Sequence, residues 1–277
     1  MRQTVSQLLT RAAARVTTVS DSPRLDAEVL LAFVLGWERT RLLAAGSTRI
    51  SRRAEAKFGQ LIQRRAAGTP VAYLTGNKEF FGLSLTVNPT VLIPRPATEL
   101  LVEAVLTAVP NDQPLVVADI GTGSGAIALA LAKQRPQYRM IATDRSLLAL
   151  RTAASNAERL GLSAQVDFRF GSLLQPVGGE TIDVIIANLP YLQPNQLDDQ
   201  TIRAEPAIAL DGGRDGLAWI RSLWSQVADR RDWRWLAIEC DPGQRSTSTV
   251  AARRLWPKAK LQAISDGRWW HGFVVER

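Results

Sequence analysis

From residue 115 onward the chain alternates short runs of aliphatic and β-branched residues with longer runs of helical periodicity, and this alternation restricts the fold most. The runs expected to form strands are 115–119, 139–143, 166–170, 182–187, 235–240, 260–264 and 273–275. The runs expected to form helices are 126–134, 146–160, 217–227 and 246–255. Such alternation is typical of a parallel sheet with helices on both faces. We therefore expect an α/β fold around a mostly parallel, seven-stranded sheet.

The last two predicted strands, 260–264 and 273–275, are only about eight residues apart. A crossover between parallel strands needs a dozen or more residues. We therefore expect the last strand to run antiparallel to its neighbour, or to lie elsewhere.

The first 70 residues have a different pattern, without strand-like runs. Apolar residues recur at helical spacing, and Gly68 and Pro70 are expected to stop the final helix of this segment. Residues 71–90 are expected to form a β-hairpin linker with Gly82 near its turn. The predicted domains are thus a helical domain over 1–70, the linker, and an α/β domain over 91–277. In the third, Thr98 is expected to cap a helix.

The net charge of +8 is concentrated at the amino-terminal end. Residues 1–70 contain twelve Lys or Arg and five Asp or Glu, a net of +7. An excess of this kind suggests an acidic partner, either nucleic acid or an acidic protein face, although a solvated helical surface gives the same count.

One cysteine and one histidine exclude an intrachain disulfide and disfavour a zinc site, so no metal is expected. The amino-terminal residues lack the apolar stretch of a signal peptide, and the longest apolar run, 29–35, is too short to span a bilayer. These features predict a soluble cytoplasmic protein without a membrane partner.

A glycine-rich loop, Gly121-Thr122-Gly123-Ser124-Gly125, separates the first strand of the sheet from its helix. Its glycines allow a tight turn and the close approach of a ligand, but the spacing also fits a dinucleotide site. Asp144 ends the next strand, 23 positions after Gly121, where a carboxylate can accept the two hydroxyls of a ribose. Together, the loop and Asp144 predict a cofactor that contains adenosine.

Two further features separate the possible cofactors. Asp119 comes two residues before Gly121, where an acid suits the amino-acid tail of a cationic sulfonium. The corner Asn188-Leu189-Pro190-Tyr191 follows a predicted buried strand. It offers a side-chain carbonyl, a backbone carbonyl and an aromatic face, which together can hold a planar amino group. Alone, this tetrapeptide also fits an ordinary turn.

These motifs resemble those of the HemK-type family, the protein-(glutamine-N5) methyltransferases that modify peptide chain release factors with S-adenosylmethionine. The resemblance covers nearly the whole chain and is carried by residues 79–83, 93–96, 98–99, 119–125, 188–191, 205–210, 212–213 and 215–217. It implies a Rossmann-like class I methyltransferase domain, preceded by a small helical domain that binds the substrate. The acceptor would be the glutamine of the Gly-Gly-Gln motif in class I release factors, with S-adenosylhomocysteine as product and no nucleic acid required.

The resemblance also implies the roles of individual residues. Those with catalytic roles would be Asn188, Leu189, Pro190 and Tyr191. Those that hold the cofactor would be Asp119, Gly121, Thr122, Gly123, Ser124, Gly125, Asp144, Ser172 and Asn188. Those that bind the substrate would be Asn188, Leu189, Pro190, Tyr191, Arg95, Thr98 and Glu99.

Three positions depart from the family pattern. Leu189 replaces a proline, Ser172 replaces an aspartate expected near the adenine amine, and Ala97 replaces an acid. The alternatives that the residues leave open are methylation of adenine N6 in nucleic acid, of guanine N2 in rRNA, or of a glutamine in a ribosomal protein. A nicotinamide dehydrogenase is a further alternative on the glycine loop alone.

Overall fold

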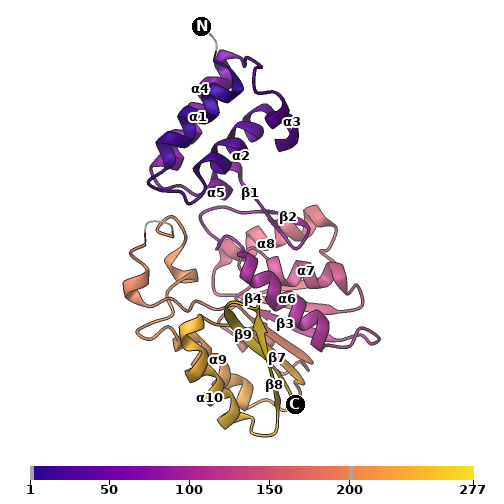
Figure 1. The fold of residues 1–277 in the computed structure, drawn as a ribbon. Coiled ribbons are helices and arrows are strands. Elements are labelled where there is room, and N and C mark those ends of the chain that lie inside the picture. Colours follow the sequence, from indigo (N-terminus) through magenta and orange to yellow (C-terminus); the bar gives the residue numbers. More distant parts are fainter. Residues whose placement is uncertain (1–2, 200–201) are drawn as a thin grey trace. The chain divides into compact units, whose positions relative to one another are not determined.

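The computed structural model describes residues 3–199 and 202–277. Met1 and Arg2, the first residues of the predicted helical domain, lie outside these ranges. The chain forms two compact units, Met1–Asn77 with Asp198–Ala204, and Lys78–Leu197 with Glu205–Arg277 (Figure 1). Within the described residues, no helix has the length and apolar character that crossing a membrane requires.

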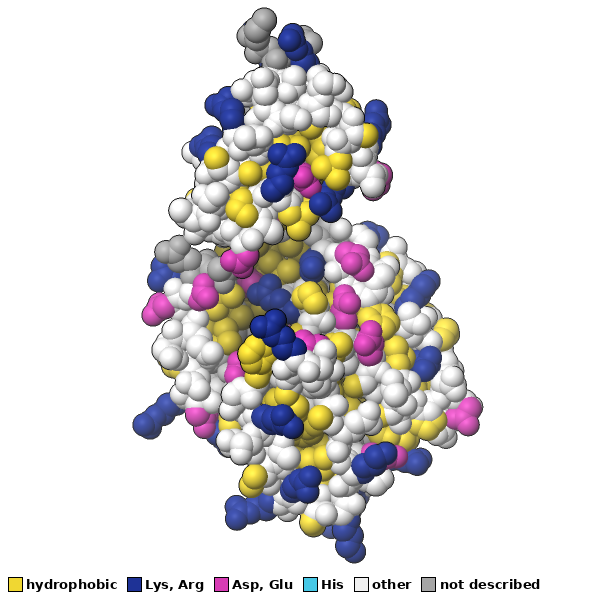
Figure 2. All heavy atoms as spheres, in the orientation of Figure 1, with side chains coloured by type: hydrophobic (Ala, Val, Ile, Leu, Met, Phe, Trp, Pro, Cys, Tyr) yellow, Lys and Arg dark blue, Asp and Glu magenta, His cyan; other side chains and the backbone are white. Residues whose placement is uncertain are grey.

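The first unit is helical, as its apolar spacing predicts. Its helices are α1 (Val5–Val16), α2 (Pro23–Leu35), α3 (Arg39–Ala44), α4 (Arg52–Ala66) and α5 (Val71–Thr75). Helix α1 buries one apolar face, which packs in one cluster with apolar side chains of α2 and α4. The buried residues of this face are Val5, Leu8, Leu9, Ala12 and Val16. The outer surface is basic, and Figure 2 shows Lys and Arg side chains scattered over the visible face of this unit.

Helix α5 lies in the segment where the linker was expected to begin. It packs against α2 and α4, and Gly76 ends it in a left-handed conformation with φ of 72°. By its contacts the helical unit therefore extends to Asn77, seven residues beyond the boundary expected from Gly68 and Pro70. The assignment of substrate binding to this unit stays a prediction.

A β-hairpin follows, formed by β1 (Asn77–Phe80) and β2 (Leu83–Thr86). Phe81 and Gly82 have φ of 49° and 73°, and two positive values are typical of the tight turn that suits strand twist. The predicted hairpin and its turn at Gly82 are confirmed. Glu99 binds this turn, because its Oε1 accepts the Phe81 N–H at 2.9 Å.

The second unit is built on a seven-stranded sheet with the order β5-β4-β3-β6-β7-β9-β8. Its strands are β3 (Val116–Ile120), β4 (Arg139–Asp144), β5 (Val166–Phe170), β6 (Val184–Ala187), β7 (Trp235–Glu239), β8 (Lys260–Ser265) and β9 (Trp270–Glu276). Strand β9 lies between β7 and β8 and is antiparallel to both, whereas the other neighbouring pairs are parallel. The mostly parallel sheet and its antiparallel last strand are confirmed.

Helices cover both faces of this sheet (Figure 1). On one face α6 (Pro96–Ala108), α7 (Ala126–Gln134), α8 (Leu147–Leu160) and the hairpin enclose one apolar cluster. On the other face α9 (Ala218–Ala228) and α10 (Arg245–Leu255) enclose a second cluster. Short 3₁₀ helices occur at Gln175–Val177, Pro194–Gln196, Ala207–Ala209 and Pro242–Gln244.

Thr98 does not cap α6, so that prediction was wrong. The helix begins two residues earlier at Pro96, and Arg95 is the N-cap residue. Proline is favoured at the first helical position, because its fixed φ matches the helix and its missing N–H is not needed there. Thr98 instead lies in the first turn of α6, with its side chain buried.

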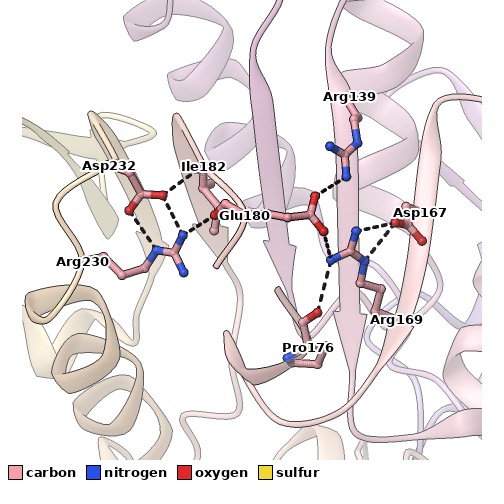
Figure 3. A network of polar contacts seen from close by, with 8 residues as sticks. All are labelled: Arg139, Asp167, Arg169, Pro176, Glu180, Ile182, Arg230 and Asp232. Carbon is pink, nitrogen blue, oxygen red and sulfur yellow. Dashed lines mark hydrogen bonds and ion pairs between the residues drawn. The ribbon is translucent and has the colours of Figure 1, made fainter. Parts of the chain in front are cut away.

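A network of ion pairs ties the loops near the amino-terminal ends of the parallel strands (Figure 3). The Glu180 carboxylate pairs with Arg169 at 2.6 Å and also with Arg139, at the start of β4. The two guanidinium groups, that of Arg169 first, lower the pKa of Glu180 to about 2. This network braces the edge of the sheet opposite Asp144 and Asn188.

Candidate active site

The glycine loop has the backbone conformation that its sequence predicts. Gly121, Gly123 and Gly125 have φ of 77°, 57° and 84°, a region that other residues rarely adopt. The N–H groups of Gly121 and Thr122 both donate to the Thr143 carbonyl, which holds the loop against β4. A Cβ at Gly121 would lie 3.1 Å from Leu189 Cδ2, so the loop and the Asn188 corner are in close contact.

Asp144 ends β4 beside this loop. One carboxylate oxygen accepts the Gly123 N–H at 2.9 Å, and the other accepts the Ser146 N–H at 2.8 Å. Burial raises the pKa of Asp144, although these hydrogen bonds favour the ionised form. The carboxylate is therefore fixed in orientation, with lone pairs left for a ligand.

An open cavity lies between the glycine loop, the end of β4 and the Asn188 corner. The predicted site residues that line it are Gly121, Gly123, Asp144, Ser172, Asn188, Leu189 and Pro190. Its other walls include Thr90, Arg145, Leu173, Ile208 and Trp219. The structure thus brings seven of the predicted residues around one space.

Asp119 lies behind the glycine loop and does not line the cavity. Its Oδ2 accepts the Thr122 hydroxyl at 2.6 Å and the Ala128 N–H at 3.2 Å. Burial raises the pKa of Asp119 to about 6, against the effect of these hydrogen bonds. Among residues 3–199 and 202–277, its Oδ1 has no hydrogen-bond partner. Thr122 and Ser124 are buried beside it, and with Gly125 they also lie outside the cavity wall.

The Asn188 corner is anchored on α6. The side-chain amide of Asn188 donates from Nδ2 to Thr98 Oγ1 at 3.0 Å, and no hydrogen bond within the described ranges uses Oδ1. The Leu189 side chain is buried against Gly121. Asn188 therefore has one end of its amide fixed to the protein and the other end available at the cavity wall.

Tyr191 is oriented by two contacts outside the cavity. Its hydroxyl donates to Glu239 Oε1 at 3.4 Å, and its backbone carbonyl accepts the Gln244 side-chain amide at 3.1 Å. Burial, followed by the charge of Glu239, raises the pKa of the Tyr191 hydroxyl. The Tyr191 side chain is thus neutral and held in place at the end of the corner. Its stacking on a substrate stays a prediction.

The Arg95 side chain faces a buried acid, Glu205. Glu205 accepts the Ile93 N–H at 2.9 Å and pairs with the Arg95 guanidinium. The carboxylate joins the Pro-Arg-Pro segment to the segment that carries Ile208 and Ala209 to the cavity. Arg95 and Glu205 therefore hold two walls of the site together, while Glu99 binds the hairpin turn.

Comparisons with known proteins agree with this geometry. Residues 7–76 match the PrmC N-terminal domain, and residues 95–208 match the methyltransferase small domain. A release factor glutamine methyltransferase from Moorella thermoacetica is 41% identical over 269 residues, which cover 96% of this chain and 94% of the relative. The chain belongs to the release factor glutamine methyltransferase family. The predicted family and the predicted class of enzyme are confirmed.

Other members of the release factor glutamine methyltransferase family show similar identity. The relative from Xylella fastidiosa is 42% identical over 247 residues, covering 87% of each chain. Among solved structures, the catalytic domain of hMettl16 in complex with MAT2A 3′UTR hairpin 6 aligns with a TM-score of 0.57 at 18% identity, over 76% of this chain and 81% of the other. A methyltransferase from Pyrococcus furiosus aligns with a TM-score of 0.53 at 20% identity, over 79% and 96%. These structures confirm the predicted methyltransferase fold.

Two positions that depart from the family pattern fall on the cavity wall. Leu189 keeps the backbone carbonyl of the corner and places its side chain on the glycine loop. Ser172 lies after Gly171, where a Cβ would meet Pro176 at 2.5 Å. The turn therefore requires glycine at position 171 whatever residue follows, and this keeps Ser172 at the cavity.

Glu205 and Glu239 are functional candidates that sequence reasoning did not assign. Glu239 ends β7 next to the Asn188 corner, and Glu205 lies in a motif already noted for the family. An acid that directly follows a run of buried strand residues, as at Glu239, was the available signal.

Proposed function

We propose that this chain transfers a methyl group from S-adenosylmethionine to the side-chain nitrogen N5 of the glutamine in the Gly-Gly-Gln motif of class I peptide chain release factors. The observation that carries the proposal is the Asn188 corner. Its amide nitrogen is held by Thr98, so Oδ1 and the Leu189 carbonyl provide two acceptors beside the cavity. Two acceptors match the two N–H bonds of a primary amide.

The residues that line the cavity suit the groups of the cofactor. Asp144 would accept the ribose hydroxyls, the glycine loop would lie against the cofactor, and Ser172 would lie near the adenine. Asp119 would act on the cationic cofactor from behind the glycine loop, where its Oδ2 accepts the Thr122 hydroxyl. When bound, S-adenosylmethionine supplies an electrophilic methyl group on a sulfonium. Asn188 also borders this space.

The residues of the corner would allow the glutamine amide nitrogen, a weak nucleophile, to attack the methyl group. An amide nitrogen reacts poorly because its lone pair is delocalised into the carbonyl. Asn188 Oδ1 and the Leu189 carbonyl would orient that nitrogen and stabilise positive charge as it develops. Pro190 stiffens the turn, and Tyr191 would cover the amide plane and exclude water. No strong base is required, since the proton can leave after transfer.

The helical unit would bind the release factor. Its net charge of +7 over residues 1–70 suits an acidic protein surface. Thr98 would contribute to substrate binding by holding the Asn188 corner, whereas Arg95 and Glu99 would contribute by holding the segments around it, through Glu205 and the hairpin turn. A cytoplasmic location and independence from nucleic acid stay predictions.

The test is transfer of labelled methyl from S-adenosylmethionine to a purified release factor, beside a copy in which the Gly-Gly-Gln glutamine is replaced by alanine. Label on the native factor alone supports the proposal. Label on neither factor, with cofactor binding intact, contradicts it. In that case rRNA, DNA and ribosomal proteins would be assayed next.

A further inference from the structure

Glu239 is a buried carboxylate that no step described so far uses. It is the last residue of β7, which pairs with β6 so that Ile238 lies opposite Ala187. The residues that follow, Asn188 and Glu239, therefore emerge side by side at the same edge of the sheet. The exposed fraction of Glu239 is only 3%. Burial of an acid at this level is costly unless the surrounding groups compensate.

The groups around Glu239 come from three other parts of the chain. Tyr191 donates its hydroxyl to Oε1 at 3.4 Å, while Oε2 is buried without a hydrogen-bond partner in the described ranges. Burial raises the pKa of Glu239, whereas Thr98, His271, Tyr191 and Asn188 all act to lower it. The carboxylate is thus a hydrogen-bond acceptor placed among the residues that hold the corner.

This placement bears on the orientation of the Asn188 amide. The two ends of an asparagine amide have similar size, so the neighbouring groups decide which end points where. Thr98 accepts from Nδ2 at 3.0 Å and keeps its own proton available for an acceptor. Glu239 accepts from Tyr191 and follows the strand residue that pairs with Ala187, so an acceptor beside Asn188 disfavours any arrangement that turns Oδ1 inward.

We propose that Glu239 is a positioning residue that, with Thr98, holds the Asn188 amide so that Nδ2 faces the protein interior and Oδ1 faces the methyl acceptor. It also fixes the Tyr191 ring through the hydroxyl. This inference rests on the proposed function. It adds a residue that acts on the rate of transfer through Asn188, without contact with the cofactor or the substrate.

Two substitutions in the full-length protein separate this role from simple packing. Glu239→Gln keeps the length of the side chain but replaces one acceptor oxygen with a donor, whereas Glu239→Asp keeps both acceptors and loses one methylene. We expect kcat for release factor methylation to fall in the order wild type, Asp, Gln, with the Gln variant down roughly 10- to 100-fold, the range seen for outer-shell partners. KM and the affinity for S-adenosylhomocysteine should stay within about threefold. Packing alone predicts the reverse order, because glutamine is the closer match in shape.

Thr98→Val provides a second, independent variant, since it keeps the shape of the side chain and removes its hydroxyl. It should also lower kcat with little change in KM, and thermal unfolding checks that each variant is folded. A Gln variant at least as active as the Asp variant, or a Thr98→Val variant with wild-type kcat, would overturn the inference alone. Wild-type protein that binds cofactor but labels no release factor would overturn the proposed function and this inference together.

Discussion

Asn188 is the residue on which the proposed chemistry depends most. It directly follows β6, donates to Thr98, and borders the cavity beside Asp144 and the glycine loop. Asn188→Ala removes one of the two acceptors without filling the cavity. We expect kcat to fall roughly 10²- to 10³-fold, as for loss of one oriented polar group, while cofactor affinity changes little.

Single-turnover methyl transfer and cofactor titration measure these two quantities separately. Asn195→Ala, at an exposed position in a nearby 3₁₀ helix, is the matched control and should leave both unchanged. Equal losses of transfer and cofactor affinity in Asn188→Ala would contradict the assigned role.

Gly121 allows a sharper test of the glycine loop. Alanine there meets both a strained backbone, with φ of 77°, and the Leu189 side chain 3.1 Å away. Gly161 has a similar φ of 70°, but a Cβ added there would meet nothing within 4 Å. Both alanine variants should lose roughly 1–2 kcal/mol of stability from the backbone.

Only Gly121→Ala should also weaken cofactor binding, by roughly tenfold or more, because the loop must shift toward or away from the cavity. Calorimetric cofactor binding and thermal unfolding of both variants give the comparison. Equal cofactor affinity in the two variants would show that the contact with Leu189 is unimportant.

Residues that end strands were predictable from the sequence because strand ends converge at one edge of a parallel sheet. Asp144 and Asn188 lie at the cavity for that reason. Glu239 was not assigned, because the pairing of β6 with β7 joins segments about 50 residues apart that carry no mark of adjacency. Asp119 was predicted to hold the cofactor, and its side chain lies under the loop, where Oδ2 accepts the Thr122 hydroxyl.

At the scale of elements, the ion pairs of Glu180 tie the loop that precedes β6 to β4 and β5 (Figure 3). The pKa of Glu180 is lowered to about 2 from 4.5, so folding favours its ionised form. That contribution to stability is fully present above about pH 4.5 and is lost as the pH falls toward 2. Glu180→Gln should therefore lower the Tm near neutral pH, and the difference from wild type should shrink below pH 4.5.

Thermal unfolding across this pH range measures the effect. Glu158→Gln, on the exposed side of α8, is the baseline for loss of one surface charge. A Tm difference for Glu180→Gln that stays constant down to the lowest pH would contradict the role of its ion pairs.

Whether a segment forms a helix or a strand was predictable where the apolar periodicity was strong. The residues at which helices begin and end were not predictable. The hairpin and the sheet strands appear where expected, because their patterns bury one face or both. Helix α5 was missed, since a five-residue helix is too short to show a period. The start of α6 was misplaced because a proline at the first position outweighed a threonine cap.

At the scale of the whole molecule, most of the excess positive charge lies in the helical unit, which makes the docking role of that unit testable. Arg52 and Arg53 are exposed at the start of α4, where acidic replacements suit the helix dipole and leave folding intact. The double reversal Arg52→Glu and Arg53→Glu should raise KM for the release factor, by roughly tenfold at low salt, with kcat little changed.

Arg253→Glu with Arg254→Glu is the control for charge, an adjacent exposed pair on α10 of the other unit, and its Tm is measured as well because acids in the last turn of a helix oppose the helix dipole. Steady-state kinetics at two salt concentrations compare the pairs, because screening weakens long-range attraction. Equal effects of the two reversals would show that the basic helical unit has no special part in docking.

The division into a helical and an α/β unit was predictable from the change in pattern near residue 70, whereas the return of Asp198–Ala204 to the helical unit was not.

The central claim is that the Asn188 corner directs a methyl group to one side-chain nitrogen. Tandem mass spectrometry of a release factor methylated by the wild-type protein tests it most directly. We expect one added methyl group, located on the side-chain amide of the Gly-Gly-Gln glutamine. A methyl group on any other residue of the factor would contradict the claim.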